Sequence, residues 1–403
     1  GSCKKRSCSS CCCTPLSTSR KMLCRASFAS GKSLFPTTKR LLSTVEVRLA
    51  PGWFVGHNLE RTPADVAVTS KEEFMEYFKL MHTMRRMEIT CHNEYLARNI
   101  RGFCHLYNGQ EAVGTGIQAG LSLEDSWITS YRCHCIMLAR GGTLEGIFAE
   151  LMGKGDGHTG GKGGSMHFYN KSQNFYGGQG IVGAQVPVGT GLAFANKYNT
   201  PPGEKMPVAI ACYGDGAANQ GQIAESANMA MLWKLPMIFC VENNRYGMGT
   251  SSERSSSNTK YFTMGNVIPG LKVDGMNVLA VREGVKFAKE HAASGKGPIF
   301  LELETYRYMG HSASDPANYR PKAEGKAILN ENDPIVVHAK NALVRHFGVT
   351  EEEVKAITNQ IKTDVLAACE RAKALPAPHI DTFADHVYID GRPDFVRMPA
   401  IQD

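Results

Sequence analysis

The stretch from residue 208 to residue 248 constrains the fold of this 403-residue chain more than any other. The apolar run at 208–213 predicts a buried strand, the pattern at 219–233 predicts a helix, and the apolar run at 237–241 predicts a second strand. A strand–helix–strand unit normally places its strands parallel, with their carboxyl ends at one edge of the sheet. We therefore expect an α/β fold in which the residues that follow these two strands lie close together.

Those residues are of the types that hold a magnesium-bound diphosphate. Gly214-Asp215-Gly216-Ala217 follows the first strand, and Asn243-Asn244 follows the second after Gly216 and 26 intervening residues. Mg²⁺ prefers hard oxygen ligands, often one or two carboxylates completed by water and phosphate oxygens. Asp215 offers a carboxylate, Asn244 a neutral carbonyl, and the sharp loop after it a main-chain carbonyl at Tyr246. Glycines and the first amides of a helix let the backbone approach an anion closely.

The spacing of these two segments resembles the thiamine diphosphate motif of enzymes that convert 2-oxo acids. From about residue 101 to residue 315 the chain is similar to the alpha subunits of the first, thiamine-dependent component of mitochondrial pyruvate dehydrogenase complexes. The similarity also rests on Gly109-Gln110-Glu111-Ala112, Tyr131-Arg132, Gly163-Gly164-Ser165-Met166-His167, Gly180-Ile181-Val182-Gly183-Ala184-Gln185-Val186-Pro187 and Tyr306-Arg307-Tyr308-Met309-Gly310-His311-Ser312.

The resemblance implies a single thiamine diphosphate- and Mg²⁺-binding domain, which we expect over residues 46–403. Its sheet should be mostly parallel and flanked by helices, with N-terminal and C-terminal helical extensions. A self-sufficient thiamine enzyme needs a second domain for the pyrimidine ring, and this chain shows no second motif-bearing domain. In the family, the glutamate that activates the aminopyrimidine belongs to a separate beta subunit. An α2β2 heterotetramer with that subunit is therefore implied.

The activity that the resemblance implies is oxidative decarboxylation of pyruvate. The acetyl group passes to a lipoyl group on an acetyltransferase component, and the whole complex yields acetyl-CoA and CO2. The cofactor carries the difficult chemistry, while the protein supplies binding, orientation and electrostatics.

The resemblance also implies roles for individual residues. Asp215, Asn244 and the Tyr246 carbonyl would hold the metal. His105 and His311 are the candidates for orienting substrate or transferring protons, with satisfied structural histidines as the alternative. The residues expected to contact the cofactor are Tyr131, Arg132, Gly180, Val182, Asp215, Gly216, Ala217, Asn244, Tyr246, Arg307 and His311.

Two serines match positions that are phosphorylated in the animal proteins. Ser312 directly follows His311, and Ser251 lies just beyond Asn244. A phosphate adds a charge of about −1.5 to −2, which would repel a diphosphate or disorder the loop, so a regulatory kinase and phosphatase are implied partners. A third serine of the animal loop has Asn318 in its place here, and Cys135 stands where the family usually has a glycine.

The first 45 residues form a leader of unusual composition. They contain nine Lys or Arg, no Asp or Glu, and six of the 13 cysteines. Basic residues interleaved with Leu, Phe, Ser and Thr are typical of a cleaved mitochondrial transit peptide, so we expect localisation in the mitochondrial matrix. Met22 is a candidate natural start. A disordered basic arm is the alternative interpretation of the leader.

The net charge of +7 comes largely from this leader. The remaining residues carry a net charge of about −2, so the charge gives no sign of a nucleic-acid partner. The chain has no run of 18 or more apolar residues, and we expect no membrane insertion. The seven cysteines after the leader are odd in number and several lie in apolar runs, which predicts buried thiols in a reducing compartment. Cys8-Ser9-Ser10-Cys11 lacks a second CxxC, so we expect no zinc there.

Several further elements are predicted outside this unit. Ser70-Lys71-Glu72-Glu73 indicates a capping box that opens a long helix. A glycine-rich segment at 153–164 follows a helix at 144–152 and is either a mobile loop or a plain long turn. Residues 178–183 fit a dinucleotide-binding pattern, but we expect no strand before them, which weakens that interpretation. Other helices are expected at 189–197 and 280–293, a strand at 298–305, and two charged helices with an irregular end from residue 334.

Three other functions remain open from the sequence. A branched-chain 2-oxoacid dehydrogenase alpha subunit would share fold and cofactor, although Arg101-Gly102-Phe103-Cys104-His105 and residues 216–221 look more like the pyruvate enzymes. A serine hydrolase would use Ser312, but the closing glycine of a nucleophile elbow is absent. A P-loop module would use Gly31-Lys32-Ser33, where Ala26 replaces the first glycine.

Overall fold

A computed structural model describes residues 44–391 and 393–395 of the chain. The predicted leader and its CxxC and P-loop-like segments therefore lie outside the described residues, apart from its last two residues. Thr44 and Val45 already belong to the first strand, β1 (Thr44–Arg48). None of the described helices is both long enough and apolar enough to cross a membrane.

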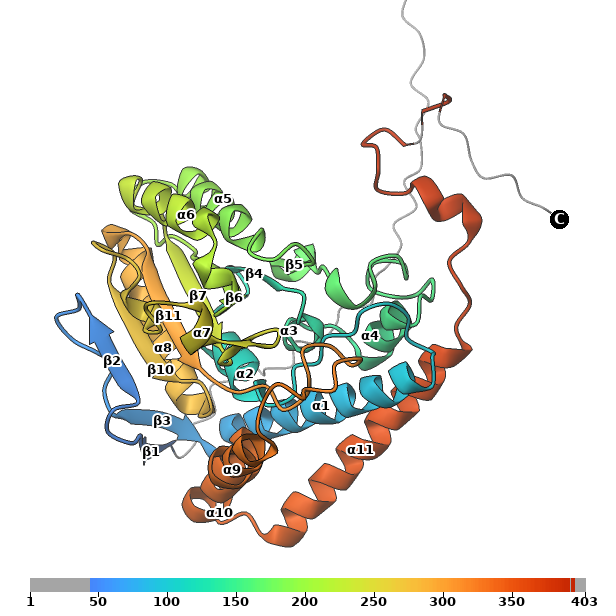
Figure 1. The fold of residues 1–403 in the computed structure, drawn as a ribbon, viewed down its shortest axis with the longest axis horizontal. Coiled ribbons are helices and arrows are strands. Elements are labelled where there is room, and N and C mark those ends of the chain that lie inside the picture. Colours follow the sequence, from blue (N-terminus) through green and yellow to red (C-terminus); the bar gives the residue numbers. More distant parts are fainter. Residues whose placement is uncertain (1–43, 392, 396–403) are drawn as a thin grey trace, which may run out of the picture. The chain divides into compact units, whose positions relative to one another are not determined.

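A seven-stranded sheet forms the centre of the fold (Figure 1). All neighbouring strands are parallel except β2, which runs antiparallel to β10 at one edge. This confirms the expected α/β architecture with a mostly parallel sheet. In spatial order the strands are β2 (Phe54–His57), β10 (Gly270–Asp274), β11 (Ile299–Glu304), β7 (Met237–Asn243), β6 (Ala209–Gly214), β4 (Ser126–Ser130) and β5 (Phe175–Gln179).

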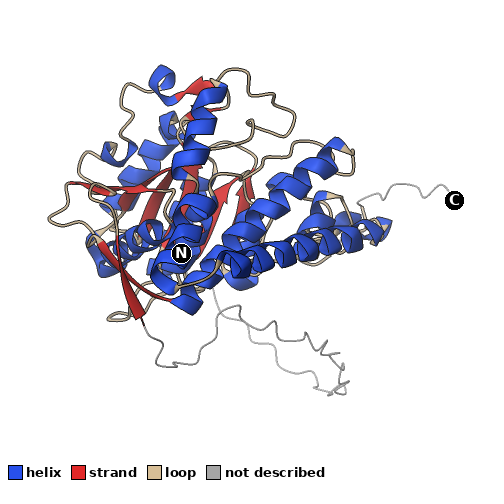
Figure 2. Cartoon of the chain, turned by 90° about the horizontal axis from the view of Figure 1, so that it is seen from below, coloured by secondary structure: helices blue, strands red, loops and turns tan. Residues whose placement is uncertain are grey.

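Alternate residues of the central strands enter two separate cores, because successive side chains of a strand point to opposite faces. In β6, Ala209, Ala211 and Tyr213 pack with residues of α5 (Gln185–Asn199) and α6 (Gly221–Leu232). Ile210 and Cys212 instead join the larger core, which includes residues of α2 (Glu111–Gly120) and α8 (Val278–His291). Helices thus cover both faces of the sheet, which Figure 2 shows as blue coils around the red strands. A strand buried on both faces explains the continuous apolar run at 208–213.

Most of the remaining helices pack on one another around two long helices. The predicted long helix is α1 (Lys71–Leu96), and it contacts α11 (Glu351–Ala374), whose start is stabilised by a capping box between Thr350 and Glu353. From Pro334 onward the prediction of two helices and an irregular end is confirmed. The others are α3 (His134–Ala139), α4 (Leu144–Leu151), α7 (Ser252–Ser255), α9 (Lys322–Asn332) and α10 (Asn341–Phe347). A π-helical turn at Pro334–Lys340 leads directly into α10. Helix α7 instead packs on strand β9 (Thr250–Ser251).

The expected N-terminal extension is not purely helical. Residues 44–70 form β1, β2 and β3 (Val66–Ser70), and β1 pairs with β3 as a separate antiparallel ribbon. The capping box at Ser70 is also only half formed. The Ser70 hydroxyl accepts a hydrogen bond from the Glu73 amide, but the Glu73 carboxylate accepts hydrogen bonds from Tyr77 and Arg282. A buried arginine competes better for that carboxylate than a backbone amide does.

Two local predictions near the central motif also need correction. Strand β5 does precede the glycine pattern at 178–183, although its sequence Phe-Tyr-Gly-Gly-Gln has no apolar alternation. It forms because β4 offers it a parallel partner at the edge of the sheet. The helix expected from Asn219 begins at Gly221 instead, since Ala217–Asn219 form a tighter 3-10 turn.

Packing between α2 and α8 depends on glycine at position 116. A Cβ atom there would lie 2.5 Å from Val281 Cβ and 3.0 Å from the Val278 carbonyl oxygen. We expect Gly116→Ala to lower the free energy of unfolding by about 1–3 kcal/mol through overpacking. Urea unfolding followed by circular dichroism measures the change.

Gly325→Ala in α9 is the matched control, because its Cβ would meet Tyr306 at an ordinary 3.8 Å. There the better helix propensity of alanine should leave stability unchanged or raise it by up to about 1 kcal/mol. Equal effects of the two substitutions would contradict the close approach of α2 and α8.

Candidate functional site

Strands β6 and β7 deliver the two predicted metal ligands to one edge of the sheet. They pair in parallel with Gly214 opposite Glu242, so Asp215 and Asn244 both emerge just past the carboxyl ends of their strands. The loops that follow also touch, because a Cβ atom on Gly216 would lie only 3.1 Å from Gly247 Cα. The expectation that the two segments come together is therefore confirmed.

Asp215 is a buried carboxylate with an unsatisfied oxygen. Its side chain belongs to a residue only 1% exposed, and none of the described residues gives Oδ2 a hydrogen bond. Burial raises the pKa of Asp215 to about 6, although backbone amides and the Arg307 charge oppose the rise. A buried carboxylate oxygen without a partner is costly, and a bound cation would remove that cost. The observation fits a divalent metal at this position.

Asn244 is oriented by a neighbour that the sequence did not single out. Asn244 Nδ2 donates to Gln110 Oε1 at 2.9 Å, and its Oδ1 accepts a 3.4 Å bond from the Tyr246 amide. Gln110 is itself buried, at the start of α2. The amide group is therefore held with its nitrogen toward Gln110, and this leaves the carbonyl oxygen as the atom that can face a metal.

The Tyr246 carbonyl and Arg307 are joined in the same loop. Arg307 follows β11, is 1% exposed, and donates through Nη1 to the Tyr246 carbonyl at 3.2 Å and through Nη2 to the Met248 carbonyl at 3.1 Å. Nη2 also donates to Tyr319 Oη at 2.8 Å. The guanidinium thus ties together the loop after β7 and the loop after β11. A carbonyl has two lone pairs, so this bond leaves the Tyr246 oxygen able to accept a second partner.

Tyr131 and Arg132 follow β4, the neighbour of β6. The chain passes from β4 outward to β5 and then returns to β6 and β7 on the other side, so β4 and β6 flank the point where strand order reverses. Doubly wound sheets bind their ligands at this point. Arg132 is buried and donates to the Leu106 carbonyl at 2.7 Å and the His311 carbonyl at 2.6 Å. Burial and the nearby Arg307 lower the pKa of Arg132 to about 10, so it is a cation at neutral pH.

His105, Tyr131 and His311 form one aromatic cluster. The ring centroids of His105 and Tyr131 lie 4.4 Å apart, those of His105 and His311 5.2 Å apart, and those of Tyr131 and His311 5.5 Å apart. Burial, reinforced by Arg132, lowers the pKa of His105 to about 2 and that of His311 to about 4. Both imidazoles are therefore neutral. The described residues leave Nδ1 of each ring without a hydrogen-bond partner.

Gly180 and Val182 lie on the loop after β5. A Cβ atom on Gly180 would meet His167 Cε1 at 3.1 Å, and the Val182 carbonyl accepts a bond from Gln222 Nε2 at 3.2 Å. This bond connects the loop to the start of α6, the helix that follows Asp215. Val182 is 42% exposed, in contrast to the buried residues of β6 and β7.

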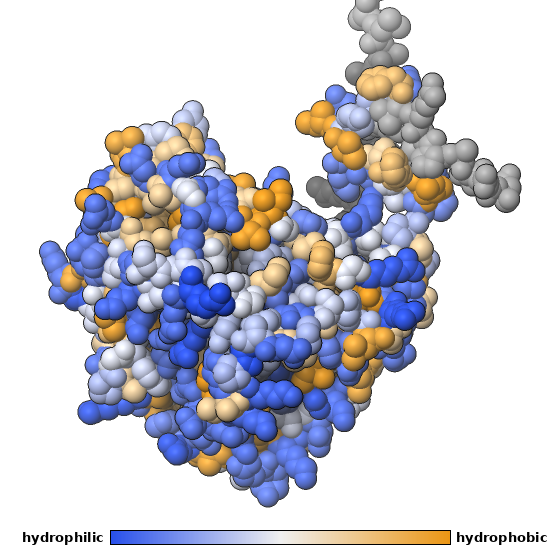
Figure 3. Space-filling view, viewed as in Figure 1, coloured by the Kyte–Doolittle hydropathy of each residue, from blue (hydrophilic) through white to orange (hydrophobic). Residues whose placement is uncertain are grey.

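Exposed apolar residues also lie on the outer surface of two helices, α5 and α6. We call the set Val188, Phe194, Tyr198, Leu232 and Trp233 the α5–α6 face. Tyr198 is 80% exposed and Leu232 71%, and the rings of Phe194 and Trp233 touch edge to face. Figure 3 shows apolar side chains among polar ones in the region where Figure 1 places α5 and α6. Large exposed apolar side chains that gather in this way are typical of interaction sites.

The two predicted phosphorylation sites differ in accessibility. Ser312 is 7% exposed, its Oγ lies 2.9 Å from Ser314 Oγ, and the next amide, of Ala313, donates to the Cys104 carbonyl at 2.8 Å. Ser251 is half-buried in strand β9 (Thr250–Ser251), where it pairs with Tyr246 of β8 (Tyr246–Gly247). Both serines thus belong to loops that carry predicted cofactor-binding residues. His311 packs on Tyr131 and His105, which is no arrangement for activating Ser312 as a nucleophile.

Sequence patterns missed several buried polar groups around the site. The Glu150 carboxylate accepts bonds from the amides of Thr159, Gly161, Gly163 and Gly164, so the glycine-rich segment is an ordered turn built on one buried carboxylate. Tyr107 Oη donates to Glu242 in β7, and burial raises the pKa of Glu242 to about 7. The seven cysteines of the described chain are buried and free, as predicted. Cys135 lies inside α3, a helical position that does not require glycine.

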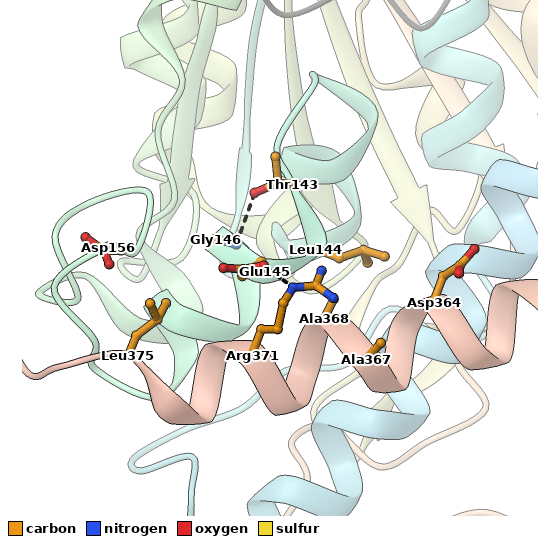
Figure 4. A pocket seen from close by; sticks show the side chains of 10 residues that line it. All are labelled: Thr143, Leu144, Glu145, Gly146, Asp156, Asp364, Ala367, Ala368, Arg371 and Leu375. Carbon is orange, nitrogen blue, oxygen red and sulfur yellow. Dashed lines mark hydrogen bonds and ion pairs between the residues drawn. The ribbon is translucent and has the colours of Figure 1, made fainter. Parts of the chain in front are cut away.

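A separate cavity of about 650 Å³ opens between α4 and α11. Figure 4 shows that Glu145 and Arg371 meet in its lining, with Arg371 Nε 2.6 Å from Glu145 Oε2. Its lining includes none of the residues predicted to bind a cofactor. The candidate site is therefore the group of residues around Asp215, Asn244 and the two histidines at the carboxyl edge of the sheet.

Comparisons with known proteins show the family to which the chain belongs. Residues 79–381 match the family model described as dehydrogenase E1 component. The chain is 48% identical over 367 residues to the mitochondrial pyruvate dehydrogenase E1 component subunit alpha of Pisum sativum, which covers 91% of this chain and 90% of that protein. It is also 48% identical over 342 residues to the somatic form of that subunit from Bos taurus, covering 85% and 86% respectively. The subunit from Solanum tuberosum is 49% identical over 361 residues.

Asp215→Asn should separate stability from metal binding. The change in the pKa of Asp215 from 3.8 to about 6 means that its ionised form destabilises the metal-free fold above pH 6, by up to about 3 kcal/mol. The penalty is absent below pH 4, where the group is protonated in both the folded and the unfolded chain. We expect the substitution to raise the metal-free melting temperature at pH 7 and to abolish Mg²⁺ binding. Calorimetry with and without Mg²⁺ measures both effects.

The exposed Asp364 on α11 provides the matched control for this measurement. Asp364→Asn should change neither the stability nor the Mg²⁺ affinity. In the unsubstituted chain Mg²⁺ affinity should fall as the pH is lowered through 6, because protons then compete for the Asp215 carboxylate. Undiminished Mg²⁺ binding by Asp215→Asn would contradict the assignment of this residue.

Proposed function

Because the chain belongs to the dehydrogenase E1 component family, we propose that it acts as the alpha subunit of a mitochondrial pyruvate dehydrogenase. It takes part in the oxidative decarboxylation of pyruvate and in the transfer of the acetyl group to a lipoyl carrier. The whole complex thereby gives acetyl-CoA and CO2. The observation that carries this function is the juxtaposition of Asp215 and Asn244 beyond the parallel strands β6 and β7, in a chain with these relatives.

Family membership implies dependence on thiamine diphosphate. The residues present fit its diphosphate end if Mg²⁺ bridges it to the protein. Asp215 would supply a charged ligand through its unsatisfied Oδ2, while Asn244 and the Tyr246 carbonyl would supply neutral ones. The amides at Gly216 and Ala217 begin a helical turn and would face the phosphates. This donor set, composed entirely of oxygen, is the kind that Mg²⁺ prefers.

When bound, thiamine diphosphate supplies the nucleophilic carbon and the electron sink for decarboxylation of a 2-oxo acid. The chain supplies the environment of the reacting groups. Arg132 and Arg307 are buried cations whose field attracts an anionic substrate and a diphosphate. His105 and His311 are neutral and present unpartnered ring nitrogens, which suits them to hydrogen-bond the substrate. Tyr131, Gly180 and Val182 would contact the cofactor from β4 and β5.

Exposed apolar side chains support a protein partner. Val182, a residue expected to touch the cofactor, is 42% exposed, and the α5–α6 face leaves further large apolar side chains exposed. We infer that the chain assembles with the beta subunit in an α2β2 heterotetramer, and that the beta subunit covers Val182 and supplies the remaining wall of the cofactor site. The lipoyl-bearing acetyltransferase component would then approach the assembled tetramer.

The names of the Pisum sativum and Bos taurus relatives say that those proteins are mitochondrial, and we propose that this protein works in the mitochondrial matrix. The leader at residues 1–45 would be the transit peptide, with the domain at residues 46–403. The relatives named above are pyruvate dehydrogenase subunits and lend no support to the branched-chain alternative. A nucleic-acid partner has no support from the net charge of about −2 after the leader.

Phosphorylation of Ser312, and of Ser251 in the neighbouring loop, would regulate the enzyme through a dedicated kinase and phosphatase. Ser312 follows His311 on the loop that Arg132 and Cys104 hold in place through backbone bonds. A phosphate there would be repelled by a bound diphosphate and would have to leave a nearly buried position, so it would pull the loop outward.

The function is tested by co-expressing the chain with its cognate beta subunit. We expect pyruvate decarboxylation that needs both thiamine diphosphate and Mg²⁺, and a kcat/KM for pyruvate at least about tenfold above that for 2-oxoisovalerate, the discrimination that one or two methylene groups give in a fitted pocket. Asn244→Ala should abolish the response to added Mg²⁺. Preference for 2-oxoisovalerate would favour the branched-chain alternative, and no cofactor dependence would contradict the proposal.

Ser312→Glu in the same αβ assembly should reduce turnover and weaken thiamine diphosphate binding. The expected loss is at least about tenfold, because a carboxylate cannot remain desolvated beside a diphosphate. Ser294→Glu, at an exposed position after α8, is the matched control and should leave both quantities unchanged. Unchanged cofactor affinity and turnover in Ser312→Glu would remove the support for regulation at this serine.

A further inference from the structure

A buried hydrogen-bond chain lies beneath the histidine cluster. His134 Nε2 is 2.7 Å from Ser165 Oγ, and His134 Nδ1 is 3.0 Å from Glu88 Oε2. Glu88 belongs to α1, His134 opens α3, and Ser165 lies in a 3-10 turn at Gly164–Met166. The three residues are 1%, 0% and 6% exposed. Segments far apart in sequence thus meet through one continuous set of polar side chains.

The chain ends on the backbone of His105. The His105 amide donates to Ser165 Oγ at 3.4 Å, and the Ala313 amide donates to the Cys104 carbonyl at 2.8 Å. Both hydrogen bonds of the His134 ring form together when its proton is on Nδ1, which donates to Glu88, and when Nε2 accepts from the Ser165 hydroxyl. A lone pair of Ser165 Oγ then remains for the His105 amide. Ser165 thereby connects the rigid helices α1 and α3 to the segment that carries a predicted substrate-facing imidazole.

Ser165 is fixed from its other side as well. The Gly163 and Gly164 amides just before it bind Glu150 Oε1 at 2.8 and 3.0 Å, and Cys133 Sγ lies 3.4 Å from the Ser165 carbonyl oxygen. The hydroxyl is therefore placed by a clamped backbone and by a hydrogen-bonded imidazole. A group held in this way can set the position of what it binds.

Two other roles for the cluster fit the contacts less well. Serine, histidine and glutamate in this order resemble a hydrolase triad, but Ser165 Oγ is buried and is already shared between His134 and the His105 amide. Ligand atoms of Glu88, Cys91 and His134 lie within 4.8 Å of one another, as metal ligands would. However, both ring nitrogens of His134 are already engaged, by Ser165 and by Glu88.

We propose that Ser165, His134 and Glu88 are positioning residues that hold the His105 backbone and so aim its imidazole into the substrate pocket. This inference rests on the proposed function, because the role of His105 toward substrate belongs to it. The imidazole itself packs on Tyr131 and His311. A small movement of the backbone at 104–105 would therefore change where its free nitrogen points.

The experiment uses the αβ assembly with Ser165→Ala, Ser165→Thr and Glu88→Gln. We expect Ser165→Ala to raise the KM for pyruvate by about tenfold, the factor that one ordinary hydrogen bond gives, with kcat changed less than about threefold. Hydrogen–deuterium exchange of the peptide at 103–107, measured without cofactor, should become faster. Ser165→Thr keeps the hydroxyl and should retain both values near those of the unsubstituted protein.

Ser226→Ala is the matched control, since Ser226 is a fully buried serine in α6 for whose hydroxyl the described residues offer no hydrogen-bond partner. It should change neither the KM nor the exchange of the 103–107 peptide. Ser165→Ala and Glu88→Gln should be non-additive in kcat/KM, because they interrupt the same chain. If Glu88→Gln does not fold, the two Ser165 variants still decide the question.

Each result bears on the proposal. A Ser165→Ala variant that only melts at a lower temperature, with KM and exchange unchanged, would show a purely structural role and overturn it. Labelling of Ser165 by a fluorophosphonate probe would also overturn it in favour of a nucleophile. An unsubstituted assembly that does not decarboxylate pyruvate would refute the proposed function, while the exchange measurement would still test the Ser165 contact.

Discussion

The parallel pairing of β6 and β7 is the constraint on which the site depends. Their register puts Asp215 and Asn244 side by side past the sheet, and it also buries Asp215 so completely that one carboxylate oxygen is left unsatisfied. A sheet covered by helices on both faces has its strand ends as the natural place for polar groups. The same packing that stabilises the fold therefore creates a local instability that a cation would relieve.

The electrostatics of the site follow from two buried arginines, neither of which is in direct contact with a carboxylate of the described residues. Arg132 and Arg307 bind backbone carbonyls in place of carboxylates, so their charge is not cancelled at contact distance. The nearest buried carboxylates act from a distance, and burial, reinforced by the field of these arginines, lowers the pKa values of His105 and His311. A site with an excess of buried positive charge favours anionic ligands and keeps its imidazoles neutral. Both properties suit a diphosphate and a 2-oxo acid.

Local patterns in the sequence predicted the parts of the structure that depend on local chemistry. The apolar runs of β6, β7 and β11 and the residues that follow them were interpretable, because a strand buried on both faces must be apolar. Strand β5 and the ribbon of β1 and β3 were missed, since their sequences carry no such run and their pairing comes from partners. Gln110 and Ser165 stand in recognised motifs, but their sequence context gave them no role of their own. A single buried polar residue gains its role from its contacts, and these join residues 31 apart for His134 and Ser165, and 134 apart for Gln110 and Asn244.

The contrast between Val182, which is 42% exposed, and Asp215, which is 1% exposed, fits a site that this chain builds on the diphosphate side only. The diphosphate half is built from strand ends that the sheet already holds in register, so it can form within this chain. Phe194, Tyr198 and Trp233 are also exposed, but they lie toward the ends of α5 and α6, at the amino edge of the sheet, where Asn196 meets Ser126 at the start of β4. A partner that covers the exposed side of Val182 as well as apolar surface of this kind would link assembly to cofactor retention thermodynamically. A partner that binds here need not touch the metal ligands to strengthen their hold on the cofactor.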